Sequence, residues 1–115
     1  MRRIAILEPT GLAQDIKVKG VKISVIPSGS ELFMVMDHDR VRFALYVIGD
    51  LWVPNQLRTV GGIRKRHPNA RMLALVQEGD IESLAIWKSN GVHTCSREPW
   101  QIILKINFIL SKIYF

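Results

Sequence analysis

The stretch FALYVIGDLWVP, residues 43–54, decides the fold. Its continuous apolar run ends in a single carboxylate, Asp50, and a proline follows at position 54. Strands that helices cover on both faces of a sheet read as unbroken apolar runs of this kind, whereas half-exposed strands alternate. Ligands of open α/β sheets bind at the carboxyl ends of such strands. The stretch therefore predicts a buried parallel strand that delivers Asp50 to the rim of a sheet.

Further apolar runs of strand length lie on both sides of this one, and segments compatible with helices separate them. The expected strands are residues 3–7, 21–26, 43–49, 72–76 and 92–96, and the expected helices are residues 12–19, 31–37, 56–66, 81–90 and 100–112. Ser30 and Asp80 are the expected N-caps of the second and fourth helices. This alternation predicts an α/β fold, a three-layer (βα)5 sandwich with a five-stranded parallel sheet between two layers of helices.

The length of 115 residues fits one domain, residues 1–115, with one core. Hydrophobic residues make up 48% and charged residues 23%, which favours neither a disordered nor a fibrous chain. A single cysteine, Cys95, excludes an internal disulfide bond and indicates a reducing compartment. No apolar run reaches the length of a membrane span. We therefore expect a cytoplasmic protein that does not enter the membrane.

The net charge of +6 raises the question of a polyanionic partner. Five basic residues gather between positions 58 and 71, without interleaved aromatic residues or a nucleic-acid-binding motif. The simplest interpretation is a solvated helix face, so we expect no direct binding of nucleic acid by this domain. The pair Gly61-Gly62 lies inside the third helix, where it is expected to loosen or kink the helix.

The last two helices differ in their apolar pattern. In the fourth, Ile81, Leu84, Ala85 and Lys88 follow the spacing of one buried stripe. The last helix, residues 100–112, is apolar around most of its circumference. Because a helix of this kind is usually buried on more than one side, the sheet alone is not expected to cover it.

The order of elements and the string Asp50-Leu-Trp-Val-Pro54 together resemble the receiver domain of two-component response regulators, which is CheY-like. The resemblance spans nearly the whole chain: residues 4–8 look like the first strand and acidic turn of that family, and residues 91–99 look like its fifth strand and lysine-proline turn. It implies a flavodoxin-like fold of strand order 2-1-3-4-5. The segment between Glu8 and Gly20 is shorter than in the family, so the first helix should be stunted.

The resemblance also implies a site. Receivers carry a phosphoryl group on the aspartate that ends the third strand, and Asp50 stands at that position. An acid pair after the first strand holds Mg²⁺ in the family, and here Glu8 matches its first member while Pro9 replaces the second. Any magnesium would therefore have only Glu8 and Asp50 as side-chain ligands, and we expect no other cofactor.

Three more positions depart from the family. Val76 replaces the hydroxyl residue of the fourth strand, Cys95 replaces the aromatic switch of the fifth, and Glu98 replaces the lysine. Exchanging a cation for an anion at ~4 Å from an acid turns roughly 4 kcal/mol of attraction into repulsion. Neighbouring acids would also raise one another's pKa unless a cation such as Arg97 intervenes.

These departures favour a degenerate receiver, a pseudo-receiver that needs no phosphorylation, is not an enzyme and signals by protein association. One alternative is a phosphoacceptor of a two-component phosphorelay that uses Asp50, with Arg97 in place of the lysine and a histidine kinase as partner. Another is a flavodoxin-like ligand binder or enzyme, against which stands the lack of a Gly-rich phosphate loop after the first strand. Trp52 is expected either to cover the pocket or to pack on the third helix.

Receivers commonly associate through the fourth helix, the fifth strand and the fifth helix. The corresponding face here is predicted to contain Trp87, Trp100, Ile103, Ile106, Phe108 and Leu110. Aromatic anchors dominate the energetics of such interfaces. We therefore expect a two-fold symmetric homodimer, or docking of a protein partner or an output domain if the chain is the N-terminal part of a longer regulator.

Overall fold

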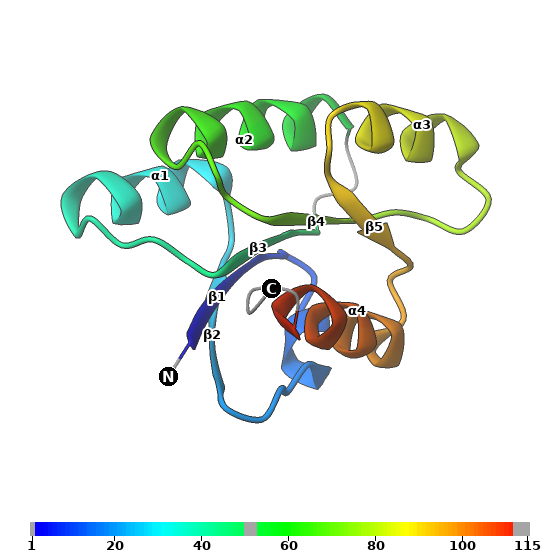
Figure 1. Cartoon of the computed structure of the whole chain (residues 1–115), viewed down its shortest axis with the longest axis horizontal. Coiled ribbons are helices and arrows are strands. Elements are labelled where there is room, and N and C mark those ends of the chain that lie inside the picture. The colour runs from blue at the N-terminus through cyan, green and yellow to red at the C-terminus, as the bar shows by residue number, and fades with distance from the viewer. Residues whose placement is uncertain (1, 50–52, 112–115) are drawn as a thin grey trace.

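A computed structural model describes residues 2–49 and 53–111 of the chain. Its strands are β1 (Arg2–Leu7), β2 (Val21–Ile26), β3 (Leu45–Ile48), β4 (Met72–Leu75) and β5 (His93–Cys95). All neighbouring strands are parallel, and their order is β2-β1-β3-β4-β5. The fold is therefore the flavodoxin-like α/β fold, with the strand order expected from the sequence (Figure 1).

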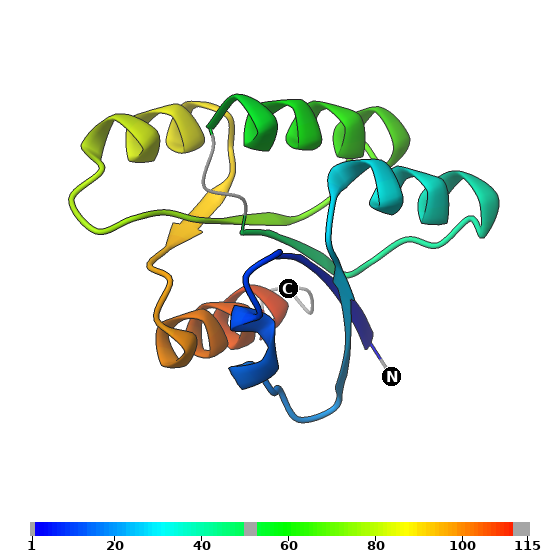
Figure 2. The same cartoon turned by 180° about the vertical axis from the view of Figure 1, so that it is seen from behind.

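Helices cover both faces of the sheet. The helices α1 (Gly29–His38), α2 (Val53–Arg66) and α3 (Ile81–Ser89) cover one face, and the short 3-10 helix η1 (Leu12–Asp15) and α4 (Pro99–Ser111) cover the other. Figure 2 shows the same two layers from behind. The crossover between β1 and β2 thus holds one 3-10 turn where the sequence suggested residues 12–19, which confirms that the first helix is stunted.

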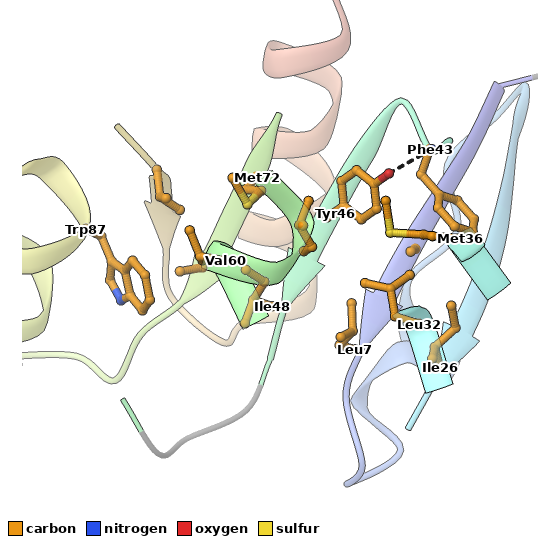
Figure 3. Close-up of a cluster of buried hydrophobic side chains, with 14 of the residues drawn as sticks. Leu7, Ile26, Leu32, Met36, Phe43, Tyr46, Ile48, Val60, Met72 and Trp87 are labelled. Carbon is orange, nitrogen blue, oxygen red and sulfur yellow. Dashed lines mark hydrogen bonds between the residues drawn. The ribbon is translucent and has the colours of Figure 1, made fainter. Parts of the chain in front are cut away.

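The strands alternate their side chains between two buried clusters, and this is why their sequences read as unbroken apolar runs. Every residue of β3 and β4 is buried. One cluster lies beneath α1, α2 and α3 and includes Tyr46, Ile48 and Trp87 (Figure 3). The other lies beneath η1 and α4 and includes Val47, Leu73 and Ile106.

Tyr46 is the polar exception within the first cluster. Its ring is fully buried, and its hydroxyl accepts a bond from the backbone N–H of Phe43 at 3.2 Å. His67 Nδ1 lies 3.1 Å from the same oxygen. Burial raises the pKa of Tyr46, with the Phe43 bond acting in the opposite direction, and burial lowers the pKa of His67. The buried hydroxyl is thereby satisfied, as buried polar groups in native cores generally are.

The helix starts agree only in part with the sequence prediction. Asp80 caps α3, because its carboxylate accepts the backbone N–H of Ser83. The prediction of Ser30 as N-cap is wrong: α1 begins two residues earlier, and Ser28 is the cap, accepting the N–H of Glu31. Both hydroxyls are reasonable caps, so the sequence alone could not choose between them.

The predicted buried stripe of α3 is also wrong. Ile81 is 76% exposed, Leu84 is 39% exposed, and Ala85 and Lys88 are exposed as well. The buried residues of α3 are instead Ser83 and Trp87, which are one turn apart. The large indole of Trp87 fills the space above the sheet, so the helix turns that side inward and leaves its smaller apolar side chains outside.

The pair α1 and α2 is in close contact through Gly62. A Cβ at this position would overlap the ring of Phe33. The guanidinium of Arg66 stacks over the same ring, 4.2 Å from its centroid, and binds both carboxylate oxygens of Asp37 at 2.9 and 3.2 Å. The helix α2 runs through both glycines without a break, and the expectation that they loosen or kink it stays a prediction.

None of the helices in residues 2–49 and 53–111 is long and apolar enough to cross a membrane.

Candidate functional site

The carboxyl edge of the sheet holds one buried acid, Glu8, immediately after β1. Its side chain is fully buried, and each of its oxygens accepts bonds. Oε2 accepts the backbone N–H groups of Thr10 at 3.0 Å and of Leu12 at 2.8 Å, and Oε1 accepts the hydroxyl of Thr10. Glu8 therefore fixes the turn that leads into η1, because it satisfies donors that the turn leaves without backbone partners.

The charge of Glu8 is neutralised by Arg97, which follows β5. Nη2 of Arg97 lies 3.0 Å from Glu8 Oε1. Nη1 of the same guanidinium donates to the backbone carbonyl of Gly49 at 2.7 Å. One side chain from the edge of the sheet thus reaches across to β1 and to the end of β3, although Arg97 and Glu8 are 89 positions apart in the sequence. We call Glu8, Arg97 and the Gly49 carbonyl the Glu8–Arg97 latch.

These contacts set the protonation state of Glu8. Burial raises the pKa of its carboxyl group, but the bonds from Thr10 and Leu12 and the charge of Arg97 together outweigh burial. The pKa of Glu8 therefore lies below its ordinary value of 4.5. The acid is ionised at neutral pH, and the rise in pKa that an unopposed cluster of acids would cause does not occur at Glu8.

Gly49 is required for this arrangement. An added Cβ would lie 2.6 Å from Glu8 Cγ and 2.9 Å from the carbonyl oxygen of Leu7. Any other residue would therefore push Glu8 away from the end of β3. Sequence reasoning missed both Gly49 and Thr10, although each stands beside a residue that it did single out.

The predicted phosphoacceptor, Asp50, and the neighbouring Trp52 lie outside the described residues. The structure does describe Gly49, so it places the end of β3 directly beside the guanidinium of Arg97. Glu8, the other predicted magnesium ligand, already accepts two bonds on each oxygen. Because a carboxylate offers about four lone-pair directions, a metal ion would have to displace one of these partners. Within residues 2–49 and 53–111, no three His, Cys, Asp or Glu side chains are grouped as metal ligands.

The replaced positions of the family pattern surround the latch. Pro9 is exposed, and Val76 is buried with its backbone N–H bonded to the carbonyl of Cys95 at 3.0 Å. Val76, Arg97 and Glu98 line one hollow of about 330 Å³, together with Gln77, Glu78, Ser96 and Gln101. Glu98 is exposed at the start of α4, so it is Arg97 that faces Glu8.

Cys95 is half-buried on β5. Burial raises the pKa of its thiol to about 11, although the nearby charge of Lys105 acts in the opposite direction. The thiol is therefore protonated at neutral pH and behaves as a small apolar group.

The predicted association face needs a correction, because its six residues do not share one surface. Trp87 is fully buried in the cluster beneath α2 and α3, and Ile106 and Leu110 are buried against the sheet. Ile103 is partly buried. The sequence of α4 has apolar residues around most of its circumference, so several of its sides could pack against the sheet. The sequence alone therefore does not show which side chains face the sheet and which face outward.

The exposed remainder of that face is a stripe along α4. Trp100, Leu104 and Phe108 are 60%, 59% and 47% exposed, and they recur every four residues. With Cys95, Gln101 and Lys105 they line an open groove of about 450 Å³. The ammonium of Lys105 lies 5.2 Å from the centroid of the Phe108 ring. We call Trp100, Leu104 and Phe108 the α4 stripe; Leu104 was not in the predicted face.

Comparison of the sequence with models of known protein families and with curated proteins finds no match.

Proposed function

We propose that this chain is a pseudo-receiver, a receiver-type signalling module that works without phosphorylation and acts by association with other proteins, first of all with a second copy of itself. The observation that carries the proposal is the Glu8–Arg97 latch. It holds a fixed cation against the acid that follows β1 and against the end of β3, where a phosphorylating receiver would bind magnesium.

The latch opposes magnesium for an energetic reason. To reach Glu8, the ion must break a partly buried pair and displace one of the four partners that the carboxylate already has. Losing a charge-assisted bond of this kind costs about 1–3 kcal/mol. A metal site with one remaining carboxylate and no second acid at Pro9 offers little in return, since magnesium retains its water ligands strongly.

The α4 stripe supports the second half of the proposal. Its spacing is symmetric about Leu104, so two antiparallel copies of α4 would bring Trp100 against Phe108 of the partner subunit and the two Leu104 side chains together at the axis. A surface that matches itself in this way fits a two-fold dimer. Exposed aromatic side chains on a helix are also the residues that contribute most to the stability of interfaces.

The competing function is phosphotransfer through Asp50, and the latch gives it one supporting observation. The guanidinium of Arg97 touches Gly49, the residue before Asp50, so a cation is close to the end of β3. In that case Arg97 would release Glu8 and compensate the phosphoryl charge, and a histidine kinase would be the partner.

One experiment separates the two functions. The intact protein is incubated with acetyl phosphate and Mg²⁺, and its mass is measured before and after. We expect no phosphoryl adduct in the wild type, because Pro9 provides no second acid for magnesium and Val76 provides no hydroxyl. An adduct that disappears in Asp50→Asn would establish the phosphorelay function instead. The variant Arg97→Ala leaves Asp50 in place, and it should also lose the adduct if Arg97 compensates the phosphoryl charge.

A further inference from the structure

The parallel topology gathers basic residues that are far apart in the sequence. In this fold the strands begin and the helices end at the same edge of the sheet, the edge at which the N-terminus lies in Figure 1. Most of the sixteen basic residues of the chain fall at this edge. They lie in residues 2–3, 19–22, 40–42, 64–66 and at position 71, and we call these five segments the basic edge.

Several arginines of the basic edge are fixed by the ends of helices. Arg2 Nη1 donates to the carbonyl of Leu110 at 3.2 Å, and Arg71 Nη1 donates to the neighbouring carbonyl of Ile109 at 3.4 Å. Arg42 Nη1 donates to the carbonyl of Met36, near the end of α1, at 3.3 Å. The carbonyl groups at helix ends carry partial negative charge, so they hold the cations in place. A guanidinium has five N–H donors, more than Arg42 and Arg71 use in these bonds to helix carbonyls.

The acidic residues do not balance the positive charge of the basic edge, because most of them lie away from that edge. Asp37 and Asp39 are close to the basic edge, and Arg66 binds Asp37 in a bidentate pair. By contrast, Glu8 and Glu98 lie at the opposite edge, after the carboxyl ends of β1 and β5. The charge of the molecule is therefore separated along the strand direction. Like charges held together raise the electrostatic energy of the free protein, and a polyanion would relieve it.

The surface of the basic edge favours one class of polyanion. Most of its cations are arginines, whose planar guanidinium matches phosphate oxygens in pairs. The exposed large apolar side chains of the described chain, such as Met34 and Trp100, lie outside its five segments. Within these five segments the described chain thus presents no large apolar wedge for a lipid layer and no exposed aromatic ring for a single-stranded base; Phe108, in the last turn of α4, lies outside them.

The dimensions also fit a duplex. The molecule measures 37 × 32 × 29 Å, so one edge can face roughly ten base pairs at a rise of about 3.4 Å each. A hollow of about 460 Å³ opens between Arg2 and Lys19 on this side. We propose that the basic edge binds the phosphate backbone of double-stranded nucleic acid without reading its sequence. The sequence alone groups only the basic residues between positions 58 and 71, and these suggest a solvated helix face. The fold adds basic residues from the other four segments to the same edge.

The test measures binding of the full chain to a fluorescently labelled DNA duplex of about 20 base pairs and arbitrary sequence, by anisotropy, between about 50 and 200 mM salt. We expect binding at low salt. The logarithm of the association constant should fall linearly with the logarithm of the salt concentration, with a slope of about −0.9 for each phosphate contacted. The variants K19E and K65E reverse exposed charges that make no structural bond to a carboxylate in the described chain. Each should reduce the slope by about one, and the double variant should weaken binding at least tenfold.

The matched control is R58E. Arg58 is exposed on α2, as Lys65 is, but it lies beside Ser28 at the start of α1, near the opposite edge. R58E should change the affinity by less than about threefold, since a distant exposed charge is screened. Thermal unfolding of each variant checks that the fold is intact.

Three results would overturn the proposal. The first is a wild type that does not bind the duplex at about 50 mM salt. The second is an equal loss of affinity in R58E and K65E, which would show a response to net charge alone. The third is sedimentation with phosphatidylglycerol vesicles in the absence of duplex binding, which would make the edge a lipid-binding surface.

Discussion

The two adjacent glycines of α2 occupy different environments. A Cβ at Gly61 meets no heavy atom within 4 Å, whereas a Cβ at Gly62 overlaps the ring of Phe33. Both residues lie inside the helix, where a glycine loses more conformational entropy on folding than any other residue. Each glycine therefore lowers the stability of the helix. Only Gly62 compensates for this cost, because it allows α1 to approach α2.

We predict opposite effects of alanine at these two positions. Gly61→Ala should stabilise the protein by about 0.5–1 kcal/mol, because it lowers the entropy of the unfolded chain. Gly62→Ala should destabilise it by about 1–3 kcal/mol, because the ring of Phe33 must move and lose its contact with Arg66. Urea unfolding measures both changes. In a Phe33→Ala background Gly62→Ala should no longer destabilise, and a loss that persisted there would disprove the role assigned to the ring.

At the scale of elements, α4 shows how one helix serves two surfaces. Its inner side buries Ile102, Ile106 and Ile109 against the sheet, and its outer side exposes the α4 stripe. The near-continuous apolar sequence of the helix therefore predicts correctly that it has more than one apolar side. It cannot say which side chains face inward, because that depends on the positions of the strands.

The dimer proposal makes a prediction at this scale. Leu104→Glu places a charge at the centre of the α4 stripe, so it should convert a dimer into a monomer while leaving the fold intact, since Leu104 is 59% exposed. Light scattering at tens of micromolar measures the mass. Met34→Glu is the matched control, because Met34 is 60% exposed on α1, on the other layer of helices. A wild type that is monomeric, or a control that dissociates equally, would contradict the proposal.

At the scale of the whole molecule, acid stability depends on carboxylates whose pKa is lowered by folding. Bonds from Arg66 lower the pKa of Asp37 and bonds from Ser83 lower that of Asp80, while the partners of Glu8 outweigh its burial. Each group binds protons more weakly in the folded state than in the unfolded state. Its contribution is therefore complete above its ordinary pKa and is lost as the pH falls through the lower folded value.

We predict that the free energy of unfolding decreases in two steps as the pH falls: the first begins near pH 6.5, because burial lowers the pKa of His67 in the folded state, and the second begins near pH 4.5, the ordinary pKa of Glu8. Glu8→Gln should cost about 1–3 kcal/mol at neutral pH, because the charged bond to Arg97 is lost. It should also flatten the decrease in acid, so the two proteins converge at low pH. Urea titrations across this pH range measure the effect, with the exposed Glu78→Gln as control. Parallel curves for wild type and Glu8→Gln would exclude Glu8 as the titrating group.

The sheet could be predicted well from the sequence because each strand is marked by an apolar run within a few consecutive residues. The unbroken run at Leu45–Ile48 and the alternation of strands with helices are sufficient for a parallel sheet, and the resemblance added the strand order. The site depends on contacts across the sheet. Glu8 could be singled out from its place after a strand, and Arg97 from its place beside Glu98. Their pairing through the gap at Gly49 is visible only in three dimensions.

The bond from Arg2 to the Leu110 carbonyl joins the first strand to the last described turn of α4. The start of β1 and the end of α4 are consequently neighbours, and a short peptide that follows Ser111 in place of residues 112–115 would connect them. New termini could then be opened at the exposed turn of Gln77, Glu78 and Gly79, where no strand register is interrupted. The fold is thus suited to circular permutation. A reporter fused to the new termini would lie at the carboxyl edge of the sheet instead of the edge where the strands begin.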